Sequence, residues 1–197
     1  MGIRQDENLI NYHWNYYLAL EKDLEQATRY VEFSEENYGT YSIEFAHLLI
    51  AAASEFEVVS KLLCQLVAPM EVRENIYHIR TILSRESPRI TTENIYIPRY
   101  GLTLDSPLER FAKASSPLWW ESYNKVKHER NSHFKEANLQ NALLALASLK
   151  IVILYYQQKK NNVLYEVRWA IDYDLKPEST LLRFDPRFYY SVQNLFP

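Results

Sequence analysis

The most apolar stretch of the chain is ALLALASLKIVILYY, residues 142–156. A helix needs about 20 apolar residues to cross a bilayer, and this stretch is shorter and carries Lys150 inside it. We therefore expect a buried core helix over about 134–159 and no membrane span. The first residues, MGIRQDENLINYHW, lack the apolar segment of a secretory signal, so we expect a cytoplasmic protein.

Two earlier segments repeat apolar residues at helical spacing, which predicts amphipathic helices. The first lies in 8–33, and the side chains expected to face inward are Leu9, Tyr12 or His13, Tyr16, Leu20, Leu24, Ala27 and Val31. The second runs from about Ser42 to Val67, with an inward stripe of Phe45, Leu48, Ala52, Phe56, Val59, Leu63 and Leu66. In this second helix Glu57 and Lys61 are four residues apart, a spacing that lets the two charges pair.

The rest of the chain completes an all-α fold. A shorter helix is expected near 71–84, and another begins at about Pro117. Between them, SPRITTENIYIPRYGLTLDSP mixes proline, glycine and β-branched residues, which predicts a short extended or β insert near 86–107. The last segment, 161–197, is irregular and aromatic and is expected to pack on the helices. We predict one domain, an up-and-down helical bundle over 8–160 with this insert and this C-terminal segment.

The composition excludes several common functions. The chain has only three glycines and contains neither G-x-G-x-x-G nor a P-loop, which excludes the commonest nucleotide-binding loops. Its formal net charge is −3, so binding to a polyanion would need a local basic patch. The single cysteine, Cys64, lies among apolar residues and is expected to be a buried thiol in a reducing compartment. We predict no cofactor.

Residues 123–134, YNKVKHERNSHF, are similar to a zinc-protease signature. In that signature two histidines four residues apart lie on one face of a helix and bind the metal. Here His128 and His133 are five residues apart, so they point about 140° apart around a helix. No cysteine cluster completes a different site, and we therefore predict no metal.

The same helix carries groups that suit a phosphodiester. Asn124, Lys127 and His128 project within about one turn of each other on a helix. A histidine transfers protons near neutral pH, and lysines stabilise the charge of a reacting phosphate. The alternative is an ordinary helix with a polar face, whose buried side would be formed by Tyr123, Val126 and the two tryptophans before them.

Glu55 falls near the apolar stripe of the helix over 42–67. A partly buried carboxylate needs a cationic or hydroxyl partner, because an unpaired one costs several kcal/mol or takes up a proton. We expect Glu55 to pair with a lysine or arginine of the YNKVKHER helix, either as a structural contact or as a group that orients His128.

Three stretches, in this order, resemble the HEPN superfamily: ASEFEVVSKLLCQ, WWESYNKVKHER and LQNALLALASLKIVILYY. The resemblance covers about residues 40–160. It implies a helical bundle that is often dimeric, and many members of the family are RNases of bacterial toxin–antitoxin and antiphage systems. We accordingly expect an intracellular homodimer whose interface includes the WWESYNKVKHER helix.

The motif of this family is an arginine, usually followed by a polar residue such as asparagine, and a histidine four to six residues after the arginine. Two copies form a composite RNase site across the dimer. Here His128 matches the histidine and Asn124 matches the polar residue, but Tyr123 occupies the position of the arginine. Lys125 or Lys127 could supply a cation, although lysine lacks the bidentate fork of arginine.

These residues lead to a first hypothesis, a HEPN-like module without catalytic activity. It would bind RNA, a nucleotide or a protein partner through the helix face from Tyr123 to His128. Glu55 and Arg130 are the further binding residues expected beside that face.

The second hypothesis is a metal-independent endoribonuclease of a bacterial toxin or antiphage system. His128 would be the general acid and base, and Lys127 or Lys125 would bind the phosphate. Asn124 would position the substrate.

Overall fold

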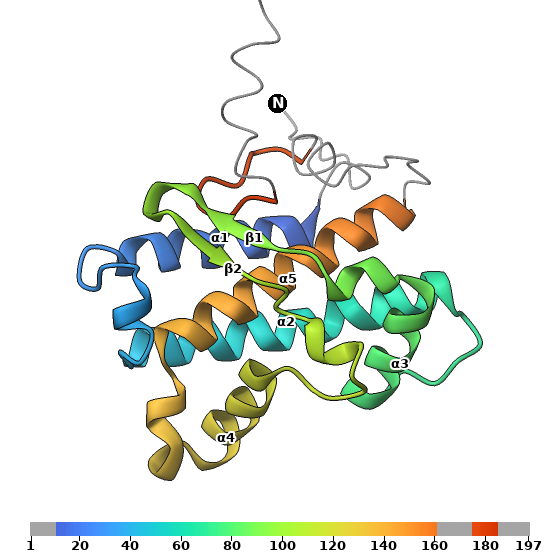
Figure 1. Cartoon of the computed structure of the whole chain (residues 1–197). Coiled ribbons are helices and arrows are strands. Elements are labelled where there is room, and N and C mark those ends of the chain that lie inside the picture. The colour runs from blue at the N-terminus through green and yellow to red at the C-terminus, as the bar shows by residue number, and fades with distance from the viewer. Residues whose placement is uncertain (1–10, 161–174, 185–197) are drawn as a thin grey trace, which may run out of the picture.

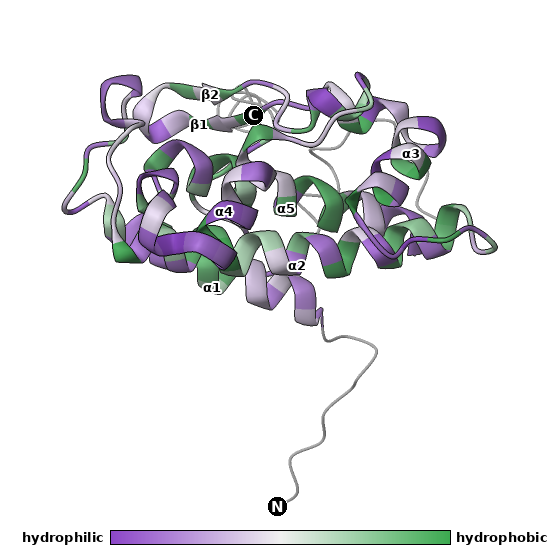
Figure 2. Ribbon diagram, turned by 90° about the horizontal axis from the view of Figure 1, so that it is seen from below, coloured by the Kyte–Doolittle hydropathy of each residue, from purple (hydrophilic) through white to green (hydrophobic). Residues whose placement is uncertain are grey.

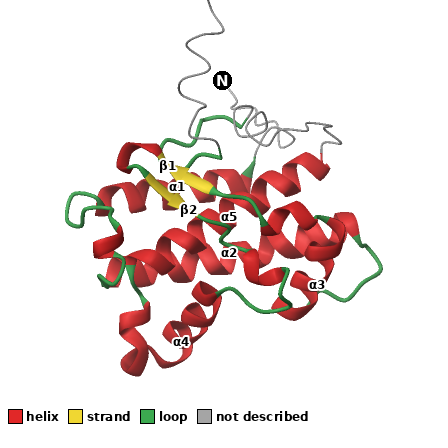
Figure 3. Ribbon diagram, in the orientation of Figure 1, coloured by secondary structure: helices red, strands yellow, loops and turns green. Residues whose placement is uncertain are grey.

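The computed structural model describes residues 11–160 and 175–184. This part of the chain contains five α-helices and one two-stranded antiparallel sheet. The helices are α1 (Tyr12–Ala27), α2 (Ile43–Val67), α3 (Ile76–Glu86), α4 (Leu118–His133) and α5 (Leu139–Lys160), and the strands are β1 (Ile95–Ile97) and β2 (Leu102–Leu104). Helices dominate the fold and the hairpin lies to one side of them (Figure 3). The prediction of a mostly helical chain is confirmed.

The two long helices α2 and α5 lie side by side in the middle of the molecule (Figure 1). Both begin at the same end, because Leu139 N donates to Thr40 O at 2.9 Å and Gln140 N donates to Tyr38 O at 3.2 Å. They therefore run in the same direction, and the chain between them returns through α3, the hairpin and α4. Figure 1 shows the hairpin above this helix pair and α4 below it.

The apolar helix α5 forms the centre of the core. All of its side chains from Ala145 to Tyr155 are buried. It begins at Leu139 and not near 134, because a short 3-10 turn, Phe134–Glu136, precedes it. By length and composition α5 is apolar enough to cross a membrane, but 83% of its most apolar window is buried inside the protein, as expected of a core helix.

Helix α2 begins and ends where the sequence predicts. Its N-cap is Ser42, whose Oγ accepts a hydrogen bond from Phe45 N at 3.0 Å. The predicted charge pair is present, with Lys61 Nζ 2.6 Å from Glu57 Oε1. The inward stripe is buried along the helix up to Leu63, and the single thiol of the chain lies beside it in the core.

Helix α1 buries part of the predicted face: Leu20 and Leu24 are buried, and Ala27 and Val31 are partly buried against the core. Tyr12 and Tyr16, which were expected inside, are 66% and 44% exposed, whereas Trp14 and Glu21 are buried. Trp14 Nε1 donates to Pro177 O at 2.9 Å. A segment near the C-terminus therefore helps to bury Trp14, a residue that the predicted stripe did not include.

Residues 175–184, called the strap below, pack on α1, α5 and the hairpin. The hairpin turns at Gly101, whose φ of +63° is a left-handed conformation that favours glycine. Arg183 N donates to Tyr96 O at 2.8 Å and Tyr96 N donates to Arg183 O at 2.7 Å, so the strap extends the edge of β1. The predictions for residues 8–10, 161–174 and 185–197 lie outside the described residues.

A buried polar network joins α1, α5 and the strap. The Glu21 carboxylate accepts hydrogen bonds from Ser179 Oγ at 2.6 Å and from the backbone amides of Thr180 and Leu182, both at 2.9 Å. The Lys150 side chain is fully buried, and its Nζ donates to Ser179 Oγ at 2.9 Å and to Leu182 O at 2.5 Å. Burial alone would raise the pKa of Glu21, but Lys150 and the surrounding donors outweigh it, so this pKa lies below its ordinary value.

Candidate functional site

The first half of α4 is anchored in the core. Trp119, Trp120, Tyr123 and Val126 are buried, as the alternative interpretation of the sequence requires. Phe56 of α2 receives the edge of the Trp119 ring, with centroids 5.1 Å apart. This aromatic contact fixes α4 on α2 and leaves the second half of the helix at the surface.

The second half of α4 is exposed and changes direction. Lys127, His128, Glu129, Arg130 and Asn131 are all exposed. Glu129 has non-helical angles, φ −138° and ψ 41°, which kink the helix between His128 and Arg130. Figure 2 shows this helix as a largely hydrophilic ribbon. The predicted angle of about 140° between His128 and His133 assumed a regular helix, so it does not describe their true positions.

The histidines of this region form no metal cluster. His133 Nε2 lies 3.3 Å from Glu129 Oε2, in an exposed pair. No group of three or more His, Cys, Asp or Glu side chains is close enough to hold a metal ion within the described ranges 11–160 and 175–184.

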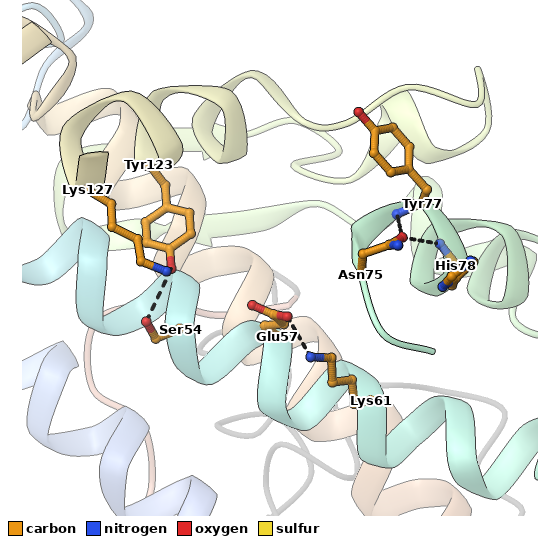
Figure 4. A network of polar contacts seen from close by, with 8 residues as sticks. All are labelled: Ser54, Glu57, Lys61, Asn75, Tyr77, His78, Tyr123 and Lys127. Atoms are coloured by element: carbon orange, nitrogen blue, oxygen red, sulfur yellow. Dashed lines mark hydrogen bonds and ion pairs between the residues drawn. The ribbon is translucent and has the colours of Figure 1, made fainter. Parts of the chain in front are cut away.

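Tyr123 lies beneath the surface and holds a lysine. Its ring is 2% exposed, and its hydroxyl accepts a hydrogen bond from Lys127 Nζ at 3.1 Å and lies 3.5 Å from Ser54 Oγ (Figure 4). The hydrogen bond to Tyr123 raises the pKa of Lys127. Tyr123, which the resemblance aligns with the motif arginine, is therefore not exposed to solvent, but its hydroxyl binds the ammonium group of Lys127. Glu57 and its partner Lys61 lie farther along α2 in the same view.

Asn124 and Lys125 are engaged in contacts within the fold. Asn124 Nδ2 donates to the carbonyl oxygen of Trp120, one turn earlier in α4, at 3.0 Å. Lys125 Nζ lies 3.5 Å from Glu136 Oε1. Glu136 also accepts a bond from Ser122 Oγ at 2.6 Å, and this bond and Lys125 keep the pKa of Glu136 below its ordinary value.

Glu55 is not part of the α4 surface. Its Oε1 lies 2.5 Å from His13 Nδ1 of α1, and the His13 ring packs edge-on against Tyr156 of α5. The expectation that Glu55 pairs with a lysine or arginine of α4 is wrong. The physical reason is the helical advance of about 100° per residue, which turns Ser54 toward α4 and Glu55 toward α1.

A groove lies between the start of α2 and the end of α4. It has a volume of about 680 Å³, and its lining is formed by Ile43, His47, Arg130, Asn131 and Phe134. Of the predicted binding residues, Arg130 lines this groove. Sequence reasoning missed His47 and Phe134, because they come from two helices that only the fold brings together.

The electrostatics of this end of the protein differ from its acidic average. Between residues 125 and 135 the chain has four lysine or arginine residues, one carboxylate and two histidines. Because the net charge of the chain is −3, a site for a polyanion requires a local excess of basic groups, and this segment has such an excess. Chemically, the surface offers lysine and arginine cations and the exposed imidazoles of His128 and His47, and the lining of the adjoining groove contains no carboxylate.

No protein-family model, curated protein or solved structure matches this chain. The functional argument therefore rests on the residues of this site.

Proposed function

We propose that the chain is a HEPN-like module that binds RNA through the exposed second half of α4 and does not cleave it. The observation that supports this proposal is the set of exposed side chains of Lys127, His128 and Arg130. In the described part of the chain the side chains of His128 and Arg130 make no hydrogen bond or ion pair with another residue, so both can receive a phosphate. Lys127 is held in place by Tyr123 without being neutralised by it.

RNA accounts for this surface better than an uncharged protein partner does. Phosphate binding by lysine and arginine releases counterions, so the exposed Lys127 and Arg130 side chains gain free energy on a polyanion. A partner without negative charge would leave these cations desolvated and unpaired, which is costly. The groove beside Arg130 also provides an apolar wall next to the cations.

The contacts around the motif favour binding over cleavage. Metal-independent cleavage needs a proton-transferring group together with donors that stabilise the reacting phosphate. The Asn124 amide donates to Trp120 O, Lys125 lies beside Glu136, and the arginine position is occupied by a buried tyrosine. His128 is left with Lys127 as its neighbouring cation, so the endoribonuclease is the second hypothesis and not the first.

We propose in addition that two copies associate through the α4 side of the bundle, as the family resemblance implies. A dimer would place two basic faces on one RNA and increase the apparent affinity through effective concentration. Sedimentation equilibrium over a range of protein concentrations tests this, and a monomer at all concentrations would contradict it.

The test is binding of a fluorescently labelled, short single-stranded RNA, measured by anisotropy at several salt concentrations with EDTA present. We expect the Lys127→Gln/Arg130→Gln variant to reduce the salt slope by about 1.4, since each phosphate contact on a single strand contributes about 0.7. The matched control is Lys22→Gln/Arg29→Gln, which removes the same charge from exposed positions of the α1 end. An equal loss in both variants, or no binding by the wild type, would contradict the proposal.

The same reactions report on cleavage. We expect the RNA to stay intact on a denaturing gel. Cleavage by the wild type that disappears in His128→Ala would replace the binding module with the endoribonuclease.

A further inference from the structure

We propose that the groove between α2 and α4 is a nucleobase subsite, in which one unpaired base of a single-stranded RNA stacks on Phe134. This inference rests on the proposed RNA-binding function and adds to it a residue-level subsite and a preference for single strands. The groove volume of about 680 Å³ lies within the range of small-molecule sites, roughly 300–1,000 Å³.

The wall of the groove suits a flat aromatic ligand. Phe134 is half-buried, and Tyr41 packs against it edge-to-face, with the two centroids 5.5 Å apart and the planes at 78°. This contact supports the Phe134 ring from one side. Ile43, in the first turn of α2, is 62% exposed and forms a second apolar surface of the groove. Unpaired bases stack on such rings, and the interaction tolerates any base because every base has a π face.

The charges around the groove select a nucleotide over an apolar ligand. Arg130 and His47 are both exposed and line the groove, and no carboxylate does. An apolar peptide in this position would leave the Arg130 guanidinium without a counter-charge, whereas a nucleotide brings a phosphate with its base. The Asn131 side chain adds amide donors and an acceptor that match the polar edge of a base.

The groove also continues the basic surface along the chain. Lys127 and His128 precede the kink at Glu129, and Arg130 follows it at the groove. The kink turns the chain so that Arg130 lines the groove, while Lys127 stays on Tyr123. A strand whose phosphates follow these cations can therefore place a base beside Phe134. The bases of a double helix are stacked and paired, so a duplex cannot fill this subsite.

The experiment compares Phe134→Leu with Phe134→Tyr in the anisotropy assay with labelled single-stranded RNA. We expect Phe134→Leu to weaken binding roughly 5- to 100-fold, the range for loss of one stacked base. Its salt slope should equal that of the wild type, because the phosphate contacts are intact. Phe134→Tyr keeps the ring and should bind like the wild type, and a duplex of the same sequence should bind more weakly than the single strand.

A measurement on the wild type removes the dependence on a substitution near the core. Single-stranded RNA that contains 4-thiouridine is irradiated on the protein, and the attached peptide is identified by mass spectrometry. We expect the crosslink on the segment that contains Asn131 and Phe134 or on the first turn of α2.

The outcomes separate the subsite from the proposed function. Binding that depends on Lys127 and Arg130 but is unchanged in Phe134→Leu, with crosslinks elsewhere, would overturn the subsite and leave RNA binding standing. Equal affinity for duplex and single strand would overturn it as well. A change of oligomeric state in Phe134→Leu without loss of RNA binding would instead assign the groove to a contact between copies. Absence of all RNA binding by the wild type would overturn both proposals.

Discussion

Replacing Glu21 with glutamine should strongly destabilise the protein, although the two side chains have nearly the same size and shape. The carboxylate accepts bonds from Ser179 Oγ and from the backbone amides of the strap, and it balances the charge of the fully buried Lys150. A glutamine side chain keeps one acceptor oxygen, but its NH₂ group faces donors, and the electrostatic attraction between Glu21 and Lys150 is lost. Breaking a buried charge pair from one side costs about 3–5 kcal/mol.

That cost is large compared with the free energy of unfolding of a typical domain, about 5–15 kcal/mol. With a urea m-value of about 3 kcal/mol/M, at the upper end for small proteins, Glu21→Gln should lower the urea midpoint by about 1–2 M. The measurement is urea denaturation followed by circular dichroism at neutral pH. Asp23→Asn is the matched control, because it makes the same chemical change at an exposed position of the same helix.

The double variant Glu21→Gln/Lys150→Met provides the decisive comparison. Each single variant loses the attraction between Glu21 and Lys150, and the double variant loses it only once, so it should be more stable than the sum of the two single losses predicts, by about 1–3 kcal/mol. Additive losses, or a midpoint for Glu21→Gln within the error of the Asp23→Asn control, would refute the account of this network.

Three further outcomes are expected. The pKa values of Glu21 and Glu136 in the folded protein lie below the ordinary 4.5, so on acidification these carboxylates take up protons in the unfolded chain before they do so in the folded protein. The free energy of unfolding should therefore be at its full value above about pH 5 and decrease as the pH falls below 4.5. A urea midpoint that rises on acidification would contradict this. Burial raises the pKa of Cys64 to about 12, so Ellman's reagent at pH 8 should leave the native thiol unmodified and titrate one thiol in denaturant. Ser42→Ala should cost about 0.5–2 kcal/mol through loss of the α2 N-cap, measured by the urea midpoint, while Ser115→Ala, whose hydroxyl caps no helix, should change it little.

The sequence predicted the elements whose burial is decided locally. The stripe of α2 up to Leu63, the apolar run of α5 and the buried aromatic side of the first half of α4 follow from the placement of apolar residues within each segment. The hairpin falls inside the predicted insert, where proline, glycine and β-branched residues limit the backbone to turns and short strands.

The burial of Trp14 and the polar network could not be predicted in this way. Glu21 and Lys150 are charged residues in helices, and charge alone would place both at the surface. Their burial depends on backbone donors and a hydroxyl of the strap, and the strap joins them only after the chain has folded back. Spacing within a helix contains no information about such a partner.

The placement of the candidate residues could be predicted only in part. His128 and Lys127 are exposed on one helix, as its spacing indicates, but the side-chain contacts that occupy Asn124 and Lys125 are tertiary or one turn away along the backbone. The kink at Glu129 and the groove beside it arise where two helix ends meet. Ile43, an apolar residue in the first turn of α2 that lies outside the predicted inward stripe, was the one signal in the sequence that could have pointed to this groove.

The strap also bears on the order of events during synthesis. Ser179 Oγ and Glu21 Oε1 are 2.6 Å apart in the fold but separated by 158 residues along the chain. At about 5–20 residues per second, the ribosome synthesises Ser179 roughly 8–30 s after Glu21. Until the strap is made, the Glu21 carboxylate lacks the Ser179 hydroxyl and the two backbone amides that compensate for its burial in the fold. We therefore expect a chain truncated before residue 175 to be less stable around Glu21 than the full chain.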